Sequence, residues 1–347
     1  MKRIWYYIVR TYISIGLIFY YKKIIAKGLE NIPKNKAVIF ISNHPNALID
    51  PLLIATTNHR LTHFLTQAAV FSGHLVKKIL HSVNMLPVYR VKDGIDSKNL
   101  KKLNEETFEK CYKILNKKEA LLIFAEGSHN FRRKVRPFRK GFIRIAFGAM
   151  EKNNNLDIDL IPVGVNYTNV TAYGGKVSVV YGEPISAKPY WKIPDRNEGM
   201  QKIKAKAEAQ LKLVTNHIND TENYDKIIQQ FNTDEFLYPK KVNAKVKTLD
   251  VESLTINRKI EQKHFNLLES IVKLNSFIPL LTWKKVKSKI NEIEFTSTFR
   301  FAIGITVFPL FYFIQAAVIR YFFGNTVGIV YLILSFLSVF VLTKTNK

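Results

Sequence analysis

Short apolar blocks alternate with amphipathic stretches through the middle of the chain. Five blocks are rich in β-branched or aromatic residues and end at turn residues, which predicts strands. They are Ala37–Ser42, Leu61–Gln67, Ala120–Ala125, Ile158–Asn166 and Lys176–Tyr181. Helical patterns such as Asn99–Leu115 and Gly141–Met150 lie between the first four. The alternation predicts an α/β domain over residues 28–190, with a largely parallel sheet flanked by helices.

The start of the chain is an aromatic-rich apolar run, Ile4–Tyr21, which is interrupted by Arg10 and flanked by basic residues. No small-residue cleavage site follows it, which argues against a signal peptide. The pattern favours a membrane-interfacial helix in residues 1–27, with Trp and Tyr rings at the depth of the lipid headgroups. A buried core helix is the alternative.

The last part of the chain holds two long apolar runs. Phe301–Ile319 carries no charge and would be about 28 Å long as a helix, close to the thickness of a bilayer core. Val327–Leu342 is a second uncharged run, and the two predict a transmembrane hairpin over residues 299–347. The second run is short for a full span, so a re-entrant or tilted pair is the alternative.

The hairpin is flanked by Lys and Arg on both sides. Basic flanks favour the cytoplasmic side of a membrane. We therefore expect the protein in the cell membrane, with its α/β domain on the cytoplasmic face. Residues 191–298, between that domain and the hairpin, have a charged, helical pattern and predict a helical extension.

The charge of the chain is strongly basic, at +26, while 47% of its residues are hydrophobic. A basic surface attracts nucleic acid, anionic lipid headgroups or phosphorylated substrates. A general preference for Lys is another source of the charge. Nucleic-acid binding also needs aromatic residues among the basic ones, whereas here the aromatic residues concentrate in the apolar segments. We therefore expect membrane lipids and phosphorylated substrates as partners, and no nucleic acid.

Cysteine content limits the chemistry further. The single cysteine, Cys111, excludes an intramolecular disulfide and a multi-cysteine zinc site. It lies in a Lys-rich helical stretch and is expected to be a structural thiol.

The first candidate for chemistry follows the strand Ala37–Ser42. Ligands of open α/β sheets bind beyond the carboxyl ends of the strands, and His44 lies just there. Pro45 predicts that a helix begins directly after His44. Such a histidine can remove a hydroxyl proton when a carboxylate fixes its tautomer, and Asp50 is the only acidic residue between Glu30 and Asp93. A helix cap at His44, with no chemical role, is the alternative.

Two further candidates follow other apolar segments. Ala120–Ala125 leads into Glu126, Gly127 and Ser128, and a basic cluster with Arg132 and Arg133 comes next. A glycine turn with neighbouring arginines suits a phosphate, although a solvated polar turn is the alternative. Arg90 ends the segment Leu86–Arg90 and offers a planar fork for phosphate.

These blocks, in this order, resemble the glycerolipid acyltransferase superfamily. That family carries a His and Asp motif, a block ending in Arg, a Phe-Pro-Glu-Gly block and an apolar block with Pro. The corresponding segments here are Asn43–Asp50, Leu86–Arg90, Phe124–Ser128 and Ile161–Val165, and Tyr181–Ile185 is a further similar segment. The resemblance covers residues of about 28 to 190.

The resemblance implies an O-acyltransferase of phospholipid synthesis. It implies that His44 takes the proton from an acceptor hydroxyl, that Asp50 orients His44, and that Arg90, Glu126 and Gly127 help hold the acceptor phosphate. The acceptor would be glycerol 3-phosphate or 1-acylglycerol 3-phosphate. The acyl donor would be acyl-CoA or an acyl carrier protein thioester, and the reaction would need no metal or bound cofactor.

The sequence departs from the family pattern at two places. The family has four residues between His and Asp, whereas five lie between His44 and Asp50, a longer spacing that also occurs in some fungal glycerol-phosphate acyltransferases. In the third block Ala125 replaces Pro, and His129 stands where many members have Arg, so Arg132 or Arg133 is expected to contribute to phosphate contact.

Other classes of function fit the sequence less well. His59 and His63 have the spacing of two metal ligands on a helix, but their segment is a predicted strand and no Glu follows His59. The chain contains no Gly-x-Ser-x-Gly motif of a serine hydrolase. A non-catalytic basic membrane protein that binds lipid headgroups or nucleic acid is the main alternative, because it would explain the charge and the hairpin.

Overall fold

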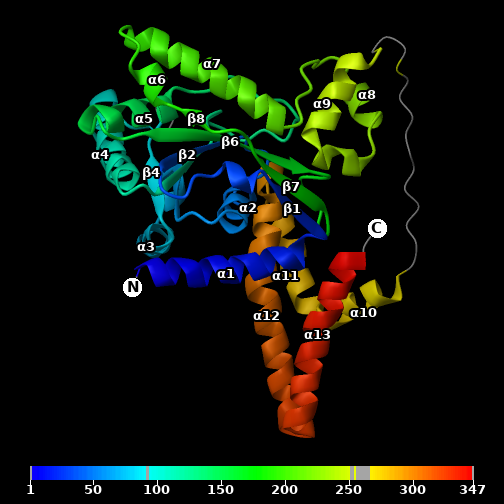
Figure 1. Ribbon diagram of the computed structural model, residues 1–347. Helices are drawn as coiled ribbons and strands as arrows, with labels where there is room; N and C mark the ends of the chain where they lie inside the picture. The colour runs from blue at the N-terminus through cyan, green and yellow to red at the C-terminus, as the bar shows by residue number, and fades with distance from the viewer. Residues whose placement is uncertain (1, 91–93, 251–253, 255–265, 346–347) are drawn as a thin grey trace.

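The computed structural model describes residues 2–90, 94–250, 254 and 266–345 (Figure 1). Its centre is one mixed sheet with strand order β1-β7-β6-β2-β5-β3-β4, and β8 pairs with β6. The strands are β1 Lys23–Lys27, β2 Ala37–Ser42, β3 Thr62–Gln67, β4 Met85–Val88, β5 Ala120–Ile123, β6 Ile158–Tyr167, β7 Lys176–Tyr181 and β8 Ile185–Ser186. Only the pairs β6–β7 and β6–β8 are antiparallel among the described strands. The prediction of a largely parallel sheet is confirmed.

Three short strands were not predicted from the sequence. β1 and β4 are the two edge strands, and β8 has two residues. Pro87 made β4 look unlike a strand, but an edge strand tolerates proline because one side of it has no hydrogen-bonded neighbour.

Helices cover both faces of the sheet (Figure 1). Successive side chains of a strand point to opposite faces, so β2 contributes Ile39 and Ile41 to one core and Val38 and Phe40 to the other. The first core is completed by α4 Ser97–Asn116, α5 Gly141–Lys152 and α7 Arg196–Val214, and the second by α1 Lys2–Tyr20 and α2 Ile49–Thr57. The short helices α3 His74–Ser82 and α6 Lys188–Trp191 complete this part of the fold.

Cys111 of α4 belongs to the first core and is fully buried. Burial raises the pKa of its thiol to about 12, so the thiol stays protonated at neutral pH. Its role is structural, as expected.

Helix α1 is amphipathic. One side packs through Tyr6, Leu17 and Tyr20 against the second core, while the other side exposes apolar residues such as Ile4 and Ile8. The sequence offered a buried helix and an interfacial helix as alternatives, and the fold combines a buried face with an apolar exposed face.

The predicted extension, residues 191–298, divides into parts with different roles. Helix α7 packs on the sheet and so belongs to the α/β layers. Helices α8 Tyr224–Gln229 and α9 Pro239–Thr248 enclose a small core of their own around Ile227 and Phe236. Helices α10 Leu267–Asn275 and α11 Phe277–Lys287 lie beside the C-terminal helices.

The C-terminal hairpin consists of α12 Thr296–Phe323 and α13 Asn325–Thr345, and it projects from the side of the domain where α1 lies (Figure 1). Both helices are long and apolar enough to cross a membrane. The second helix has 21 residues and is about 31 Å long, longer than its uncharged run predicted. Gly324, with φ of +88°, is the single residue between the two helices.

Helix α13 returns to α1. Lys344 donates to the backbone oxygens of Ile18 and Tyr21, each at 2.8 Å, at the C-terminal end of α1. Cations are favoured at that end of a helix, because its last carbonyl groups point outward without a partner in the helix.

Candidate active site

His44 lies directly beyond the carboxyl end of β2, and α2 begins only at Ile49. The prediction of a helix starting at Pro45 is wrong. Asn43 explains the difference, because its side chain donates to the backbone oxygen of Val165 at 3.0 Å and accepts from the Val165 amide at 2.8 Å. Asn46 similarly donates to the backbone oxygen of Val170 at 2.9 Å. These bonds hold residues 43–48 in a turn against β6.

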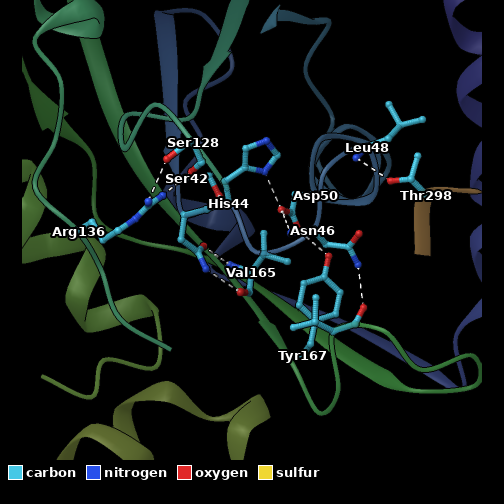
Figure 2. Close-up of polar contacts among 12 residues, drawn as sticks. Ser42, His44, Asn46, Leu48, Asp50, Ser128, Arg136, Val165, Tyr167 and Thr298 are labelled. Carbon is cyan, nitrogen blue, oxygen red and sulfur yellow. Dashed lines mark hydrogen bonds and ion pairs between the residues drawn. The ribbon is translucent and has the colours of Figure 1, made fainter. Parts of the chain in front are cut away.

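The turn brings His44 and Asp50 together in spite of the additional residue between them. Asp50 is in the first turn of α2, and its Oδ2 lies 2.8 Å from His44 Nδ1 (Figure 2). Because the segment between them is not helical, the insertion does not rotate Asp50 away from His44.

Asp50 is completely buried. Its carboxylate accepts hydrogen bonds from the Asn46 amide at 2.7 Å and from the Tyr167 hydroxyl at 2.5 Å, in addition to its contact with His44 (Figure 2). Burial raises the pKa of Asp50, while the bonds from Tyr167 and Asn46 oppose that shift. In its ionised form the carboxylate accepts the Nδ1 proton of His44, and Nε2 of the ring is then left as a proton acceptor.

The imidazole of His44 is enclosed by other rings. It stacks on Phe124 with centroids 3.5 Å apart and an angle of 7° between the planes, and His129 lies 4.3 Å away. Burial, with a smaller contribution from the charge of Arg136, lowers the pKa of His44 to about 3. At neutral pH the ring is therefore uncharged, which is the form that a general base requires.

The loop after β5 is organised by a residue that the sequence did not single out, Arg136. Its Nε lies 2.6 Å from Glu126 Oε2. Its Nη1 donates to Ser128 Oγ at 2.9 Å (Figure 2). Burial raises the pKa of Glu126, and the pairing with Arg136 opposes that shift. Gly127, between Glu126 and Ser128 in the sequence, has φ of +79°, a conformation that glycine adopts without strain.

Arg90 joins this loop from the end of β4. Its Nη1 donates to the backbone oxygen of Gly127 at 3.3 Å, and its Nη2 contacts the side chain of Gln67. The blocks around His44, Arg90 and Glu126 thus meet at one edge of the sheet, as the sequence predicted.

The two neighbouring arginines have different surroundings. Arg132 is exposed, with its guanidinium 5.3 Å from the centre of the Tyr224 ring. The guanidinium of Arg133 lies 3.7 Å from the centre of the Phe236 ring and donates to the backbone oxygen of Thr168 at 3.1 Å. Burial lowers the pKa of Arg133 to about 10. Arg132 is therefore open to a ligand, whereas Arg133 packs the extension onto the domain.

The start of the hairpin also reaches the site. The Phe295 ring contacts His129 with centroids 5.5 Å apart, and Thr298 Oγ1 accepts a hydrogen bond from the Leu48 amide at 3.1 Å (Figure 2). No local pattern near residue 295 signals this contact. Tyr167 likewise has no local signal, because it reaches Asp50 only through the parallel pairing of β6, which it ends, with β2.

No group of three or more His, Cys, Asp or Glu side chains is placed to hold a metal ion in the described part of the chain. Of the two histidines with metal-ligand spacing, His63 instead pairs with Glu119, with His63 Nε2 and Glu119 Oε2 2.7 Å apart.

A family model described as "Acyltransferase" matches residues 23–166, which include the candidate site residues from His44 to Arg133. The segment is thus similar to acyltransferases. The family assignment agrees with the ordered blocks around His44, Arg90 and Glu126.

The chain also aligns with curated proteins. A probable 1-acyl-sn-glycerol-3-phosphate acyltransferase of Mycoplasma pneumoniae is 27% identical over 144 residues, which are 40% of this chain and 51% of that protein. The 1-acyl-sn-glycerol-3-phosphate acyltransferase of Borreliella burgdorferi is 28% identical over 144 residues, covering 42% of this chain and 54% of that protein. The chain thus spans about half the length of these relatives.

Two more distant similarities extend the comparison. Glycerol-3-phosphate O-acyltransferase 1 of Saccharomyces cerevisiae is 26% identical over 78 residues, 22% of this chain and 10% of that protein. The crystal structure of the 1-acyl-sn-glycerophosphate acyltransferase PlsC from Thermotoga maritima superimposes with a TM-score of 0.42 at 18% identity, covering 59% of this chain and 78% of that one.

The hydrogen bond from Tyr167 to Asp50 should stabilise the acyltransferase domain. We expect Tyr167→Phe to lower the free energy of unfolding by about 1.5–3 kcal/mol, because it removes a hydrogen bond to a buried charged group. In an Asp50→Asn background the same substitution should cost less, by about 1 kcal/mol or more. Chemical denaturation of the four proteins in detergent gives this difference.

Tyr181→Phe is the matched control. Tyr181 is equally buried, but its hydroxyl bonds Thr57 and the backbone oxygen of Ile54. Its effect on the free energy of unfolding should add to that of Asp50→Asn. If the effects of Tyr167→Phe and Asp50→Asn were also additive, the coupling between Tyr167 and Asp50 would be contradicted.

Proposed function

We propose that the protein transfers a fatty-acyl group from an activated donor to the hydroxyl of a glycerol-phosphate-type acceptor in phospholipid synthesis. The observation that carries the proposal is the uncharged His44 held by the buried Asp50, beside a glycine turn and Arg90. The printed names of the curated relatives support the same reaction class, with 1-acylglycerol 3-phosphate or glycerol 3-phosphate as acceptor.

The proposed reaction begins at Nε2 of His44. This nitrogen takes the proton of the acceptor hydroxyl as the oxygen attacks the carbonyl carbon of the acyl thioester. The C–S bond then breaks, and the imidazolium returns the proton to the leaving thiolate, so an ester and a free thiol are formed. Asp50 keeps the ring in the required tautomer and stabilises the imidazolium. The thioester is one of CoA or of an acyl carrier protein.

The acceptor phosphate is proposed to bind at the loop after β5. Arg90 supplies charged donors, and Gly127 allows the backbone to approach the ligand closely. Glu126 acts through Arg136, because a carboxylate repels phosphate and the two side chains are paired. Ser128 is fixed by the same arginine, and Arg132 lies exposed nearby. The contacts of Arg133 with Phe236 and Thr168 favour a structural role over phosphate binding.

The protein is proposed to lie in the cell membrane with its catalytic domain on the cytoplasmic face. Two helices long enough to span a membrane and the exposed apolar side of α1 support membrane association. Such a position brings the site to the lipid boundary, where acyl chains dissolve in the membrane and glycerol phosphates in water.

His44→Ala should reduce acyl transfer by about 10²–10⁴-fold, because a general base contributes that much. Asp50→Asn should also reduce transfer, since an amide cannot stabilise the imidazolium. Purified protein in lipid, offered glycerol 3-phosphate and lysophosphatidate separately, gives the rates and identifies the acceptor.

His63→Ala provides a matched control, because His63 is also a half-buried histidine paired with a carboxylate but lies on β3 beside Glu119. It should retain wild-type activity. Transfer that survives His44→Ala in a folded protein would show that His44 is not the base. The absence of transfer by folded wild type to either acceptor would instead favour the non-catalytic basic membrane protein.

The pH dependence of transfer should report the pKa of His44. Only the unprotonated ring is active, and burial together with Arg136 keeps its pKa below 6.5, so wild-type activity should fall only at acidic pH. Arg136→Gln removes a nearby positive charge, which raises the pKa of His44 and moves the acid limb of the profile to higher pH. Arg136→Lys keeps the charge and should leave the limb near its wild-type position.

Rates measured from about pH 4 to pH 9 compare the three enzymes. Titration of the acceptor phosphate is common to all of them and cancels in the comparison. An acid limb that does not move in Arg136→Gln would show that the charge of Arg136 does not act on the base.

Cysteine labelling tests the proposed orientation. Lys101→Cys places a thiol at an exposed position of α4, Asn325→Cys places one at the tip of the hairpin, and Cys111 is buried and serves as the background. A membrane-impermeant maleimide should label Asn325→Cys in intact cells and Lys101→Cys only in inside-out vesicles. Labelling of both from the same side would indicate a re-entrant hairpin.

A further inference from the structure

A cavity of about 460 Å³ lies outside the acyltransferase domain, between α1 and the helices α10 to α13. This volume falls in the range of small-molecule sites. Its walls are almost entirely apolar and include Ile15, Phe301, Gly304 and Phe308. Because α12 and α13 are the candidate membrane helices, the cavity lies where hydrocarbon is available.

Helix α12 links this cavity to the candidate active site. Phe295, just before the helix, contacts His129, and Arg300 and Phe301 line the cavity. Arg300 lies five positions after Phe295, which is about 7.5 Å along a helix. A lipid with its glycerol at His44 would therefore have its chain beside the mouth of the cavity.

Polar groups are found at the end of the cavity near the site. Arg300 donates to the backbone oxygen of Thr171 at 2.7 Å and lies 4.6 Å from the Trp283 ring. The buried Tyr20 hydroxyl lies close to Ser297 and Arg300 and makes no hydrogen bond within the described residues. A buried hydroxyl without a partner is costly, and a ligand oxygen at this place would supply one.

We propose that this cavity binds the hydrocarbon chain of a single-chain phospholipid acceptor, with the existing ester of that lipid beside Arg300 and Tyr20. The inference rests on the proposed function, which puts the glycerol phosphate at His44 and Arg90. Glycerol 3-phosphate has no chain to bury and gains nothing from the cavity. A lysophospholipid gains the burial of its apolar surface and two donors for its ester oxygen.

Gly304 provides a way to fill the cavity. It lines the cavity, and a Cβ atom added to it meets no atom within 4 Å, so a larger side chain enters open space. Leu310 lies six positions further on the same helix, is exposed, and is not part of the cavity wall. Gly304→Phe, with the smaller Gly304→Leu as a second variant, is therefore matched by Leu310→Phe as the control.

The test uses full-length protein in nanodiscs and a lysophosphatidate with a photoreactive diazirine in its acyl chain. Mass spectrometry should locate the label on α12 and α13 in wild type and equally in His44→Ala, because binding does not need catalysis. Labelling should fall about tenfold in Gly304→Phe, by less in Gly304→Leu, and remain unchanged in Leu310→Phe. Unlabelled lysophosphatidate should compete, and glycerol 3-phosphate should not.

Kinetics gives an independent measurement. Gly304→Phe should raise the KM for lysophosphatidate and leave transfer to glycerol 3-phosphate, where wild type shows it, unchanged. Undiminished labelling in both Gly304 variants would overturn the proposal. Competition by the acyl donor would also overturn it and would assign the cavity to the donor chain. Competition by a diacyl phospholipid would overturn it as well and would assign the cavity to bulk lipid. Failure of the proposed function is separate, because it would abolish the His44 dependence of transfer while labelling persisted.

Discussion

The buried carboxylate of Asp50 is the constraint on which the rest of the site depends. A charge that is wholly removed from water must have hydrogen-bond donors around it. Two segments supply them: the turn after β2, with the Asn46 amide and the ring of His44, and the end of β6, with Tyr167. The side chains of Asn43 and Asn46 hold this turn against β6 and the residues that follow β6. The strands β2 and β6 must therefore be paired in the correct register, and the start of α2 must be in place, before the carboxylate has all its hydrogen-bond donors. The position of His44 is in this sense a consequence of the sheet.

Much of the domain could be predicted from the sequence, because strands in the interior of a sheet are apolar on both faces. β2 and β7 were predicted with their observed boundaries, and the edge strands β1 and β4 were missed since one is flanked by Lys and the other contains proline. The pairing of His44 and Asp50 was also predictable, but its partner Tyr167 is 117 residues away from Asp50 and carries no local signal of its role. Arg136 could not be told from its basic neighbours, because only the fold shows which of these arginines meets Glu126 and which meets Phe236. The start of the helix after His44 was predicted wrongly, since the preference of Pro45 for a first helical turn was outweighed by the side-chain bonds of Asn43 and Asn46.

Helix α12 has two roles in the molecule. Its first turn contacts the residues around His44, and its remaining length forms the apolar hairpin. In most α/β folds, loops at the carboxyl ends of the strands close the site, whereas here part of that function falls to a helix that continues into a candidate membrane span. The depth of the hairpin in a bilayer and the surroundings of His129 are therefore set by one rigid element.

The contact of Lys344 with the end of α1 also bears on the order in which the protein folds. The amine and the carbonyl oxygen of Ile18 are 326 positions apart, so α1 receives this partner only after the sheet and the hairpin have been synthesised. Until then the carbonyl groups of Ile18 and Tyr21 lack this partner, while the sheet behind α1 can already form from residues 23–181 and supplies Gly174 as donor to Tyr20. Helix α1 can therefore pack on the sheet through Tyr6, Leu17 and Tyr20 before the hairpin forms, but it gains the contact with Lys344 only afterwards.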